Sequence, residues 1–177
     1  HPEYSTTIDV PSGIAEVIID PTNRLADAYM PDNSSKHNTT VSFNPQLWEY
    51  ADWKNYEFKY SPDIWWNNYD GMKIGMNLSG GYMNHHHLID AKFWLNTGAL
   101  QKDSMVYPND YDNYSYLLDY NTNLDKITLN SRLKIRSQFI AGLYTNNISI
   151  EKSDKKGNNQ LKIKLLSLYR TNSEYLI

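Results

Sequence analysis

The sequence contains no cysteine, which excludes disulfide bonds, thiolate metal ligands and cysteine nucleophiles. It also lacks an excess of positive charge, because 17 Lys and Arg stand against 20 Asp and Glu and the formal net charge is −3. A chain with this balance has no general attraction to nucleic acid, so we expect no nucleic-acid partner. Finally, it contains no run of about 18 apolar residues, the minimum for a transmembrane helix.

Aromatic residues are abundant, with 15 Tyr and 5 Trp among 177 residues, and this composition predicts a folded, β-rich protein. The longest regular pattern lies in residues 127–144, where apolar side chains occupy odd positions and Arg132, Lys134 and Arg136 occupy even ones. A period of two predicts one long strand with an apolar and a cationic face. Ordinary strands have about 5 to 6 residues and tilted membrane strands about 9 to 11. We therefore expect an outer-membrane type strand or a long-stranded soluble sheet.

The same alternation predicts six strands from Tyr56 onward, over residues 56–60, 72–79, 89–99, 114–121, 127–144 and 161–170. The predicted fold class is all-β: the end of a β-sandwich followed by an antiparallel meander of long amphipathic strands. Six strands are fewer than the roughly eight that a closed outer-membrane barrel needs. The meander is therefore expected to be a partial barrel or an open curved sheet.

Turn residues divide the chain into three predicted parts. Residues 1–36 are interpreted as the terminal strands of a sandwich, with a hairpin of 4–10 and 14–20 around a Pro-Ser-Gly turn. Residues 37–70 form an aromatic-rich junction, and residues 71–177 form the barrel-like, incomplete meander. The chain begins without Met and without a signal sequence and ends just after a strand-like run, so we expect a piece of a longer polypeptide.

Several short motifs carry a family resemblance. Residues 10–33 resemble the closing strands of the β-sandwich in M1-family (gluzincin) zinc aminopeptidases. The following residues, up to the Tyr-Asp-Gly-Met-Lys-Ile-Gly segment 69–75, resemble the β-rich, outer-membrane-barrel-like region of long M1-like proteins from Bacteroidetes-type bacteria. The matching positions are Val17 to Ile19, Asp20-Pro21, Leu25-Ala26-Asp27, Asn33, Trp48, Trp53, Tyr56 and Trp65-Trp66.

The resemblance implies a location in the bacterial cell envelope, at the outer membrane or in the periplasm, and an upstream peptidase domain on the same polypeptide. The chain departs from the family in its chemistry. The His-Glu-x-x-His helix that holds zinc and the Gly-x-Met-Glu-Asn loop are both missing from the sequence. No catalytic residue or zinc ligand is therefore carried over, and zinc is expected only in a longer parent protein.

The aromatic stretch is the main candidate binding region. Its rings could fill a junction, anchor at a membrane interface, or form a platform for carbohydrate or peptide. The candidate binding residues are Trp48, Trp53, Trp65, Trp66 and Tyr69.

Two polar segments have the residue types of metal sites. His85 and His87 point the same way on an extended backbone and Asp90 follows, so a His/His/carboxylate site is geometrically possible. A solvated hairpin tip is the plainer interpretation. The loop with Asp103, Asp110 and Asp112 offers oxygen ligands for calcium, but it lacks the Gly and distal Glu of a helix-loop-helix site.

The cationic row of Arg132, Lys134 and Arg136 is expected to line a lumen and pair with acids such as Asp119, to face bulk water, or to attract a polyanion. Motifs for nucleophilic or acid–base catalysis are missing from the sequence. The predicted function is non-catalytic: anchoring or orienting the upstream peptidase, with outer-membrane lipid as a partner. The alternative is a soluble β-sheet module that binds carbohydrate or peptide.

Overall fold

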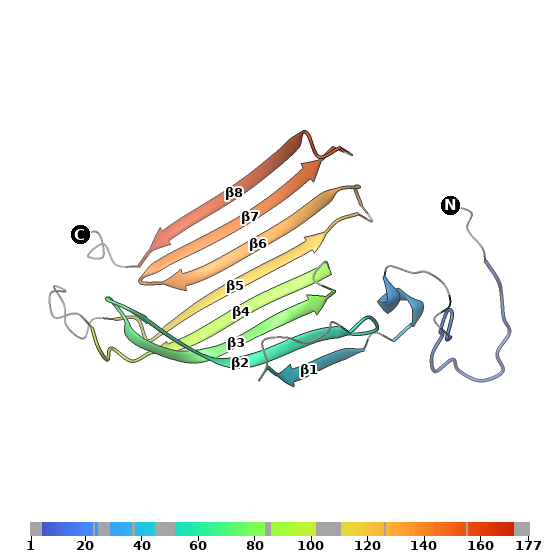
Figure 1. Ribbon diagram of the computed structural model, residues 1–177, viewed down its shortest axis with the longest axis horizontal. Coiled ribbons are helices and arrows are strands. Elements are labelled where there is room, and N and C mark those ends of the chain that lie inside the picture. Colours follow the sequence, from blue (N-terminus) through green and yellow to red (C-terminus); the bar gives the residue numbers. More distant parts are fainter. Residues whose placement is uncertain are drawn as a thin grey trace.

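The computed structural model describes residues 5–22, 24, 29–36, 38–44, 52–83, 86–101, 111–125, 127–154 and 156–171. They form one eight-stranded sheet and a short 3-10 helix, η1 (Met30–Asn33). The strands are β1 (Thr39–Phe43), β2 (Tyr56–Asn67), β3 (Gly71–Tyr82), β4 (His86–Asn96), β5 (Tyr114–Asn123), β6 (Ser131–Ile140), β7 (Leu143–Ser153) and β8 (Gln160–Arg170). The sheet is open, with β1 at one edge and β8 at the other (Figure 1). The predicted all-β class and open curved meander are confirmed.

Strand order follows chain order throughout the sheet. The pairing of β1 with β2 is parallel, and each later strand pairs antiparallel with the strand before it. Strands β2 to β8 have 10 to 12 residues each. They are about twice as long as an ordinary strand.

The register places most apolar side chains on one face and most charged ones on the other. Met76, Phe93, Tyr116 and Phe139 lie opposite one another on consecutive strands and so share a face. The positions between them carry charges, since Asp119 is paired with Arg136. We call these surfaces the apolar face and the polar face.

The sheet bends toward its polar face at the β2–β3 end. Gly75 on β3 lies between Asp63 and Trp94, and a Cβ atom at Gly75 would come within 1.9 Å of the Phe93 carbonyl oxygen. The Trp65 and Trp94 rings approach to 5.6 Å although β3 separates their strands. Strands two apart are about 10 Å from each other in a flat sheet, so these rings reach over a concave surface. Figure 1 shows the ends of β2 and β3 curling out of the plane.

The single long strand predicted over 127–144 is wrong, because the chain reverses within it. Ile140 and Leu143 are paired, and the two residues between them, Ala141 and Gly142, have φ angles of 50° and 67°. Two consecutive positive φ angles are typical of the type I′ turn, which suits a two-residue hairpin. The predicted alternation is confirmed over Ser131–Ile140.

The predicted number of strands from Tyr56 onward, six, is also wrong, since the structure has seven there. The segment after Gly142, interpreted as a hairpin end, is strand β7. Sequence reasoning also missed β1 and the second half of β2, which contains Pro62. Pro62 lies beyond the register of β1, which ends at Tyr60, so it occupies a part of β2 that forms the sheet edge. Proline is tolerated at an edge because no neighbouring strand needs its missing N–H.

The hairpin predicted for 4–10 and 14–20 does not form in the described residues. Residues 5–22 contain no strand, and one isolated bridge joins Ile18 to Ser34. Ile8 and Ile14 are 73% and 63% exposed, so these apolar runs bury little surface. A two-stranded hairpin without a packing partner is marginally stable at best. The assignment of residues 1–36 to a sandwich stays a prediction.

The β6–β7 turn gives a test of backbone strain. Gly142→Ala should lower the free energy of unfolding by about 1 to 2 kcal/mol, because a Cβ atom disfavours the left-handed conformation. The measurement is urea unfolding followed by tryptophan fluorescence. Gly13→Ala is the control, since a Cβ atom there meets nothing within 4 Å. Equal effects of the two substitutions would contradict the assigned turn.

Candidate functional site

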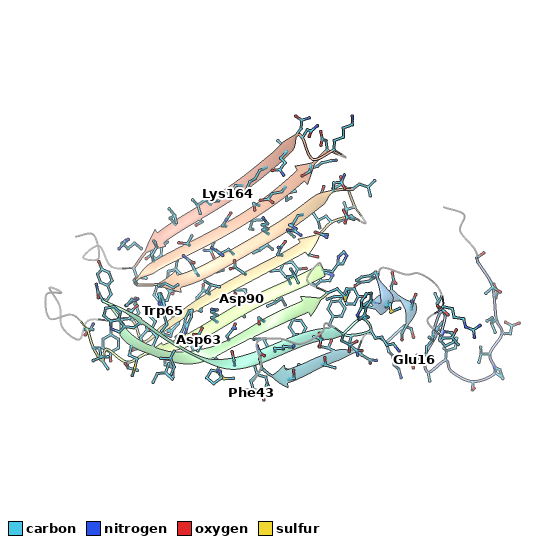
Figure 2. All side chains as sticks on the ribbon, viewed as in Figure 1. Glu16, Phe43, Asp63, Trp65, Asp90 and Lys164 are labelled. Atoms are coloured by element: carbon cyan, nitrogen blue, oxygen red, sulfur yellow. The ribbon has the colours of Figure 1, made fainter. Side chains whose placement is uncertain are left out.

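The apolar face carries many exposed hydrophobic side chains. It extends from β2 to β8 without an element covering its centre (Figure 2). Soluble monomers rarely expose contiguous apolar patches beyond a few hundred Å², and larger ones mark partner or membrane surfaces. Its exposed members are Tyr60, Ile64, Trp66, Ile74, Met76, Leu78, Phe93, Leu95, Tyr114, Leu118, Ile148, Ile150, Leu161, Ile163, Leu165 and Tyr169.

Aromatic rings gather at one end of the apolar face in an aromatic row formed by Phe93, Tyr114, Phe139, Tyr144 and Tyr169. Successive ring centroids are 6.1, 5.5, 4.1 and 6.2 Å apart, from β4 to β8. The hydroxyl oxygens of Tyr114 and Tyr144 are 3.3 Å apart, and this hydrogen bond raises the pKa of Tyr144 to about 12. The row therefore places two phenylalanine and three tyrosine rings along the end of five strands.

A second group of rings, the aromatic cluster, lies at the opposite end of the strands and consists of Tyr29, Tyr56, Tyr82, His87 and Tyr120. The Tyr82 ring lies 5.1 Å from Tyr29 and 5.8 Å from Tyr56, which is itself 6.0 Å from His87. The Nδ1 atom of His87 and the hydroxyl oxygen of Tyr120 are 2.6 Å apart. Aliphatic side chains on the apolar face separate the cluster from the aromatic row.

The polar face holds a fully buried charge. Lys73 and Asp70 both have 0% side-chain exposure, and the Lys73 ammonium donates to the Asp70 carboxylate at 2.5 Å. It also donates to Asn96 Oδ1 at 2.8 Å and to Ser115 Oγ at 2.6 Å. The Trp65 ring centroid lies 5.6 Å from the Lys73 nitrogen. All three ammonium protons thus have an acceptor.

These four residues, which we call the Lys73 cluster, connect strands β3, β4 and β5. Asp70 belongs to the β2–β3 turn, Lys73 to β3, Asn96 to the end of β4 and Ser115 to the start of β5. Burial is the main cause that lowers the pKa of Lys73, and the hydrogen bond to Asp70 opposes it. A charge at this depth is tolerated because it is paired and hydrogen-bonded. Sequence reasoning missed the cluster, because Lys73 appeared as one polar position of an alternating strand and its partners Asn96 and Ser115 are far away in the sequence.

The cationic row lies on the polar face, as predicted, and its acid partners come from the neighbouring strands. Arg136 makes two hydrogen bonds of 2.6 Å to Asp119, which confirms the predicted pair. This contact is the main cause that raises the pKa of Arg136. Lys134 pairs with Glu151 at 2.9 Å. The row is therefore largely neutralised across the sheet.

Two further ion pairs follow the same pattern. Lys162 on β8 contacts Glu151 at 2.6 Å, so Glu151 bridges cations from both neighbouring strands. The two lysines together lower the pKa of Glu151 to about 2, and the Lys162 hydrogen bond contributes most. Lys92 and Asp63 are 3.5 Å apart across β3. The polar face is a network of cross-strand ion pairs.

The candidate binding aromatics do not share one surface. Trp65 lies on the polar face against Lys73, whereas its neighbour Trp66 lies on the opposite face and donates to the Leu100 carbonyl. Trp53 precedes β2 at the other end of that strand and is 62% exposed. Tyr69 lies in the β2–β3 turn, where its carbonyl oxygen accepts a hydrogen bond from Gln101. Trp48 lies outside the described residues.

The candidate metal ligands are also separated. His87 contacts Tyr120 on the apolar face, whereas Asp90 is paired with Asp119 on the polar face. His85, Asp103 and Asp110 lie outside the described residues, and Asp112 accepts a hydrogen bond from Asn96 through its carbonyl oxygen. The described residues contain no group of three His, Asp or Glu side chains arranged to hold a metal ion.

Comparison of the chain with protein-family models, with curated proteins and with solved structures gives no match. In the part of the chain that the structure describes, no helix has the length and apolar character to cross a membrane. The function is therefore inferred from the two faces of the sheet.

The Lys73 cluster predicts a large stability effect. Lys73→Met should lower the free energy of unfolding by about 3 to 5 kcal/mol, because it leaves the Asp70 carboxylate buried without its cation. Lys164→Met, at an exposed position on the same face, should change it by less than about 0.5 kcal/mol. Urea unfolding of both variants measures the difference. Similar urea midpoints for the Lys73→Met and Lys164→Met variants would show that the Lys73 ammonium is not buried.

Glu151 predicts a specific response to acid. Its folded-state pKa of about 2 lies below the ordinary glutamate value of 4.5, so its stabilising contribution is present above pH 4.5 and is lost as the pH falls toward 2. In Glu151→Gln the free energy of unfolding should depend less on pH in that interval. At neutral pH the substitution should lower this free energy by no more than about 1 kcal/mol, because the ion pairs are screened by solvent. Carboxyl titration by NMR checks the assignment. A Glu151 carboxyl titrating near 4.5 would contradict it.

Proposed function

We propose that this chain is a non-catalytic anchor of the bacterial cell envelope, whose apolar face contacts the hydrocarbon of the outer membrane. The observation that carries the proposal is the apolar face, on which aromatic rings end strands β4 to β8, a second group of rings lies at the opposite end of β2 to β5, and exposed aliphatic side chains lie between. A polar row of Ser137, Asn146 and Ser167 crosses this face on β6 to β8. Tyr and Trp gather where hydrocarbon meets water, because their rings are apolar and carry a polar group. Aromatic rings at two levels are typical of strands that cross a lipid layer.

Strand length supports the same proposal. Strands β2 to β8 have 10 to 12 residues, and a tilted strand needs about 9 to 11 to cross a bilayer. On β8, Leu161 and Tyr169 are eight steps apart, which corresponds to about 26 Å of extended chain. Between them, Ile163 and Leu165 are 60% and 68% exposed. Contact with lipid would remove this area from water.

The polar face favours a structural role over chemistry. Its charged groups hold adjacent strands together through Asp119–Arg136, Lys134–Glu151 and Lys162–Glu151 pairs. The buried Lys73 has its three protons directed at fixed acceptors, so it is held in place. The proposed task of this face is to stabilise the sheet and meet water.

The proposal that the anchored partner is a zinc-dependent peptidase domain of the M1 type has separate support. It rests on the resemblance of residues 8–100, which contain no zinc ligand of that family. A peptidase held on an envelope sheet would act near the membrane surface. The zinc and the chemistry would belong to that domain.

The alternative of a soluble binding module finds less support. A stacking platform needs several rings on one surface, and Trp65 and Trp66 occupy opposite faces of β2. Trp53 lies at the other end of the same strand. The exposed aliphatic positions of the apolar face would also meet water in such a module.

Two adjacent leucines on β8 provide a matched test of lipid contact. Leu165 lies on the apolar face opposite Ile148, and Leu166 lies on the polar face opposite Asn147, with exposures of 68% and 53%. Leu165→Arg should cost about 2 to 4 kcal/mol in lipid, whereas Leu166→Arg should cost at most about 1 kcal/mol. The measurement is unfolding in vesicles of phosphatidylethanolamine and phosphatidylglycerol, with flotation to quantify association.

Equal loss of association in the two variants would refute lipid contact through the apolar face. A monomeric, folded chain that stays in buffer without detergent and does not float with vesicles would support the soluble module instead. Circular dichroism of both variants controls for loss of the sheet.

A further inference from the structure

The two edges of the sheet differ in how they are protected. At the first edge, β1 has five residues, and Pro62 lies in the part of β2 that β1 leaves uncovered. Short edge strands and prolines are devices that prevent an edge from pairing with another chain. This edge is therefore poorly suited to accept a strand.

The other edge, β8, lacks these features. β8 pairs with β7 over eleven consecutive positions without a register shift, and its sequence from Gln160 to Arg170 contains no proline. No strand pairs with its outer side in the part of the chain that the structure describes. Its hydrogen-bonding groups on that side form a straight row, which is a template for a further strand.

Side chains of β8 are exposed on both faces. Leu161, Ile163 and Leu165 on the apolar face are 60% to 68% exposed. On the polar face Leu166 and Leu168 are 53% and 60% exposed. A neighbouring strand would cover part of both sets, since side chains directly opposite on paired strands lie about 4.5 to 5.5 Å apart.

The charge pattern indicates what that strand carries. Cations of the polar face find acids on adjacent strands: Arg136 on β6 meets Asp119 on β5, and Lys162 on β8 meets Glu151 on β7. Lys164 is opposite Ser149 on β7 and makes no ion pair with any residue that the structure describes. Figure 2 places Lys164 on this outermost strand. On β7 the residues nearest Lys164 on this face are Asn147, Ser149 and Glu151, and Glu151 already contacts Lys134 and Lys162. A carboxylate for Lys164 would therefore come from the far side of β8.

We propose that the outer edge of β8 binds a further β-strand that is apolar on one side and acidic on the other. Its apolar side would extend the apolar face, and a carboxylate opposite Lys164 would complete the ion-pair network. A second copy of β8 fits less well, because it would bring Lys162, Lys164 and no carboxylate to the interface. The proposal rests on the edge and its charges and holds whether or not the apolar face meets lipid.

The test uses the full chain in detergent micelles and two probe peptides of about ten residues, one alternating Leu and Glu and the other alternating Leu and Lys. The readout is hydrogen exchange of the amides of residues 160–170, followed by mass spectrometry. The Leu/Glu peptide should slow the exchange of the β8 amides and leave the exchange rate of the β1 amides unchanged. Binding of the Leu/Lys peptide should be at least about fivefold weaker, because like charges directly opposite are unfavourable.

Lys164→Glu is the matched variant, since Lys164 is exposed and makes no ion pair that its loss would break. This substitution should weaken binding of the Leu/Glu peptide and strengthen binding of the Leu/Lys peptide by about fivefold each. Equal binding of the two peptides, or protection at β1 in place of β8, would overturn the proposal. Protection of β8 that rises with protein concentration without any peptide would assign the edge to a second copy and overturn it as well.

Discussion

The structure depends on keeping a two-residue alternation in register across eight strands. A shift of one residue in any pairing would move the whole apolar set of that strand to the opposite surface. The observed register avoids this from β2 to β8, so that Ile135, Ile148 and Leu165 remain on one face and Arg136, Asn147 and Leu166 on the other. Both the proposed lipid contact and the proposed strand addition follow from that constraint.

The two faces are stabilised differently. Few hydrophobic residues are buried, and among the described residues they are Tyr82, Trp94 and Phe139. Much of the cohesion between strands therefore comes from the backbone ladder and from polar contacts, among which the Lys73 cluster is the most buried. Asp70, Lys73 and Ser115 are completely inaccessible to water, although they belong to the polar face. The Trp65 ring lies 5.6 Å from the Lys73 nitrogen, and backbone groups of Gly98 and Asp112 bond to Asp70 and Asn96 of the same cluster.

Alternation alone was sufficient to predict the all-β class, the meander and the face of each cation in residues 131–140. It did not locate the Ala141-Gly142 turn, although the alternation changes phase there: Phe139 and Tyr144 lie opposite each other, so apolar-face positions are odd before the turn and even after it. The strand Thr39–Phe43 was missed because it is short and lies beside polar loop residues. Short strands depend on their neighbours more than on their own sequence.

The candidate sites were harder to predict than the fold. The Asp119–Arg136 pair follows from two adjacent alternating strands, and it was predicted. The separation of His87 from Asp90 follows from the alternation itself, because residues three positions apart along a strand lie on opposite faces. The Lys73 cluster joins residues 42 positions apart, and no local pattern marks such a contact.

The nearest-neighbour topology has a consequence for how the sheet assembles. Every strand pairs with the strand beside it in sequence, and the β2–β3, β3–β4 and β6–β7 connections are short, so closing them costs little chain entropy. Longer connections, residues 44–55 and 97–113, precede β2 and β5. The β6–β7 hairpin, with its two-residue turn and the Phe139–Tyr144 stack at 4.1 Å, has the shortest closure of all. This hairpin is suited to act as a folding nucleus, to which neighbouring strands are added on both sides.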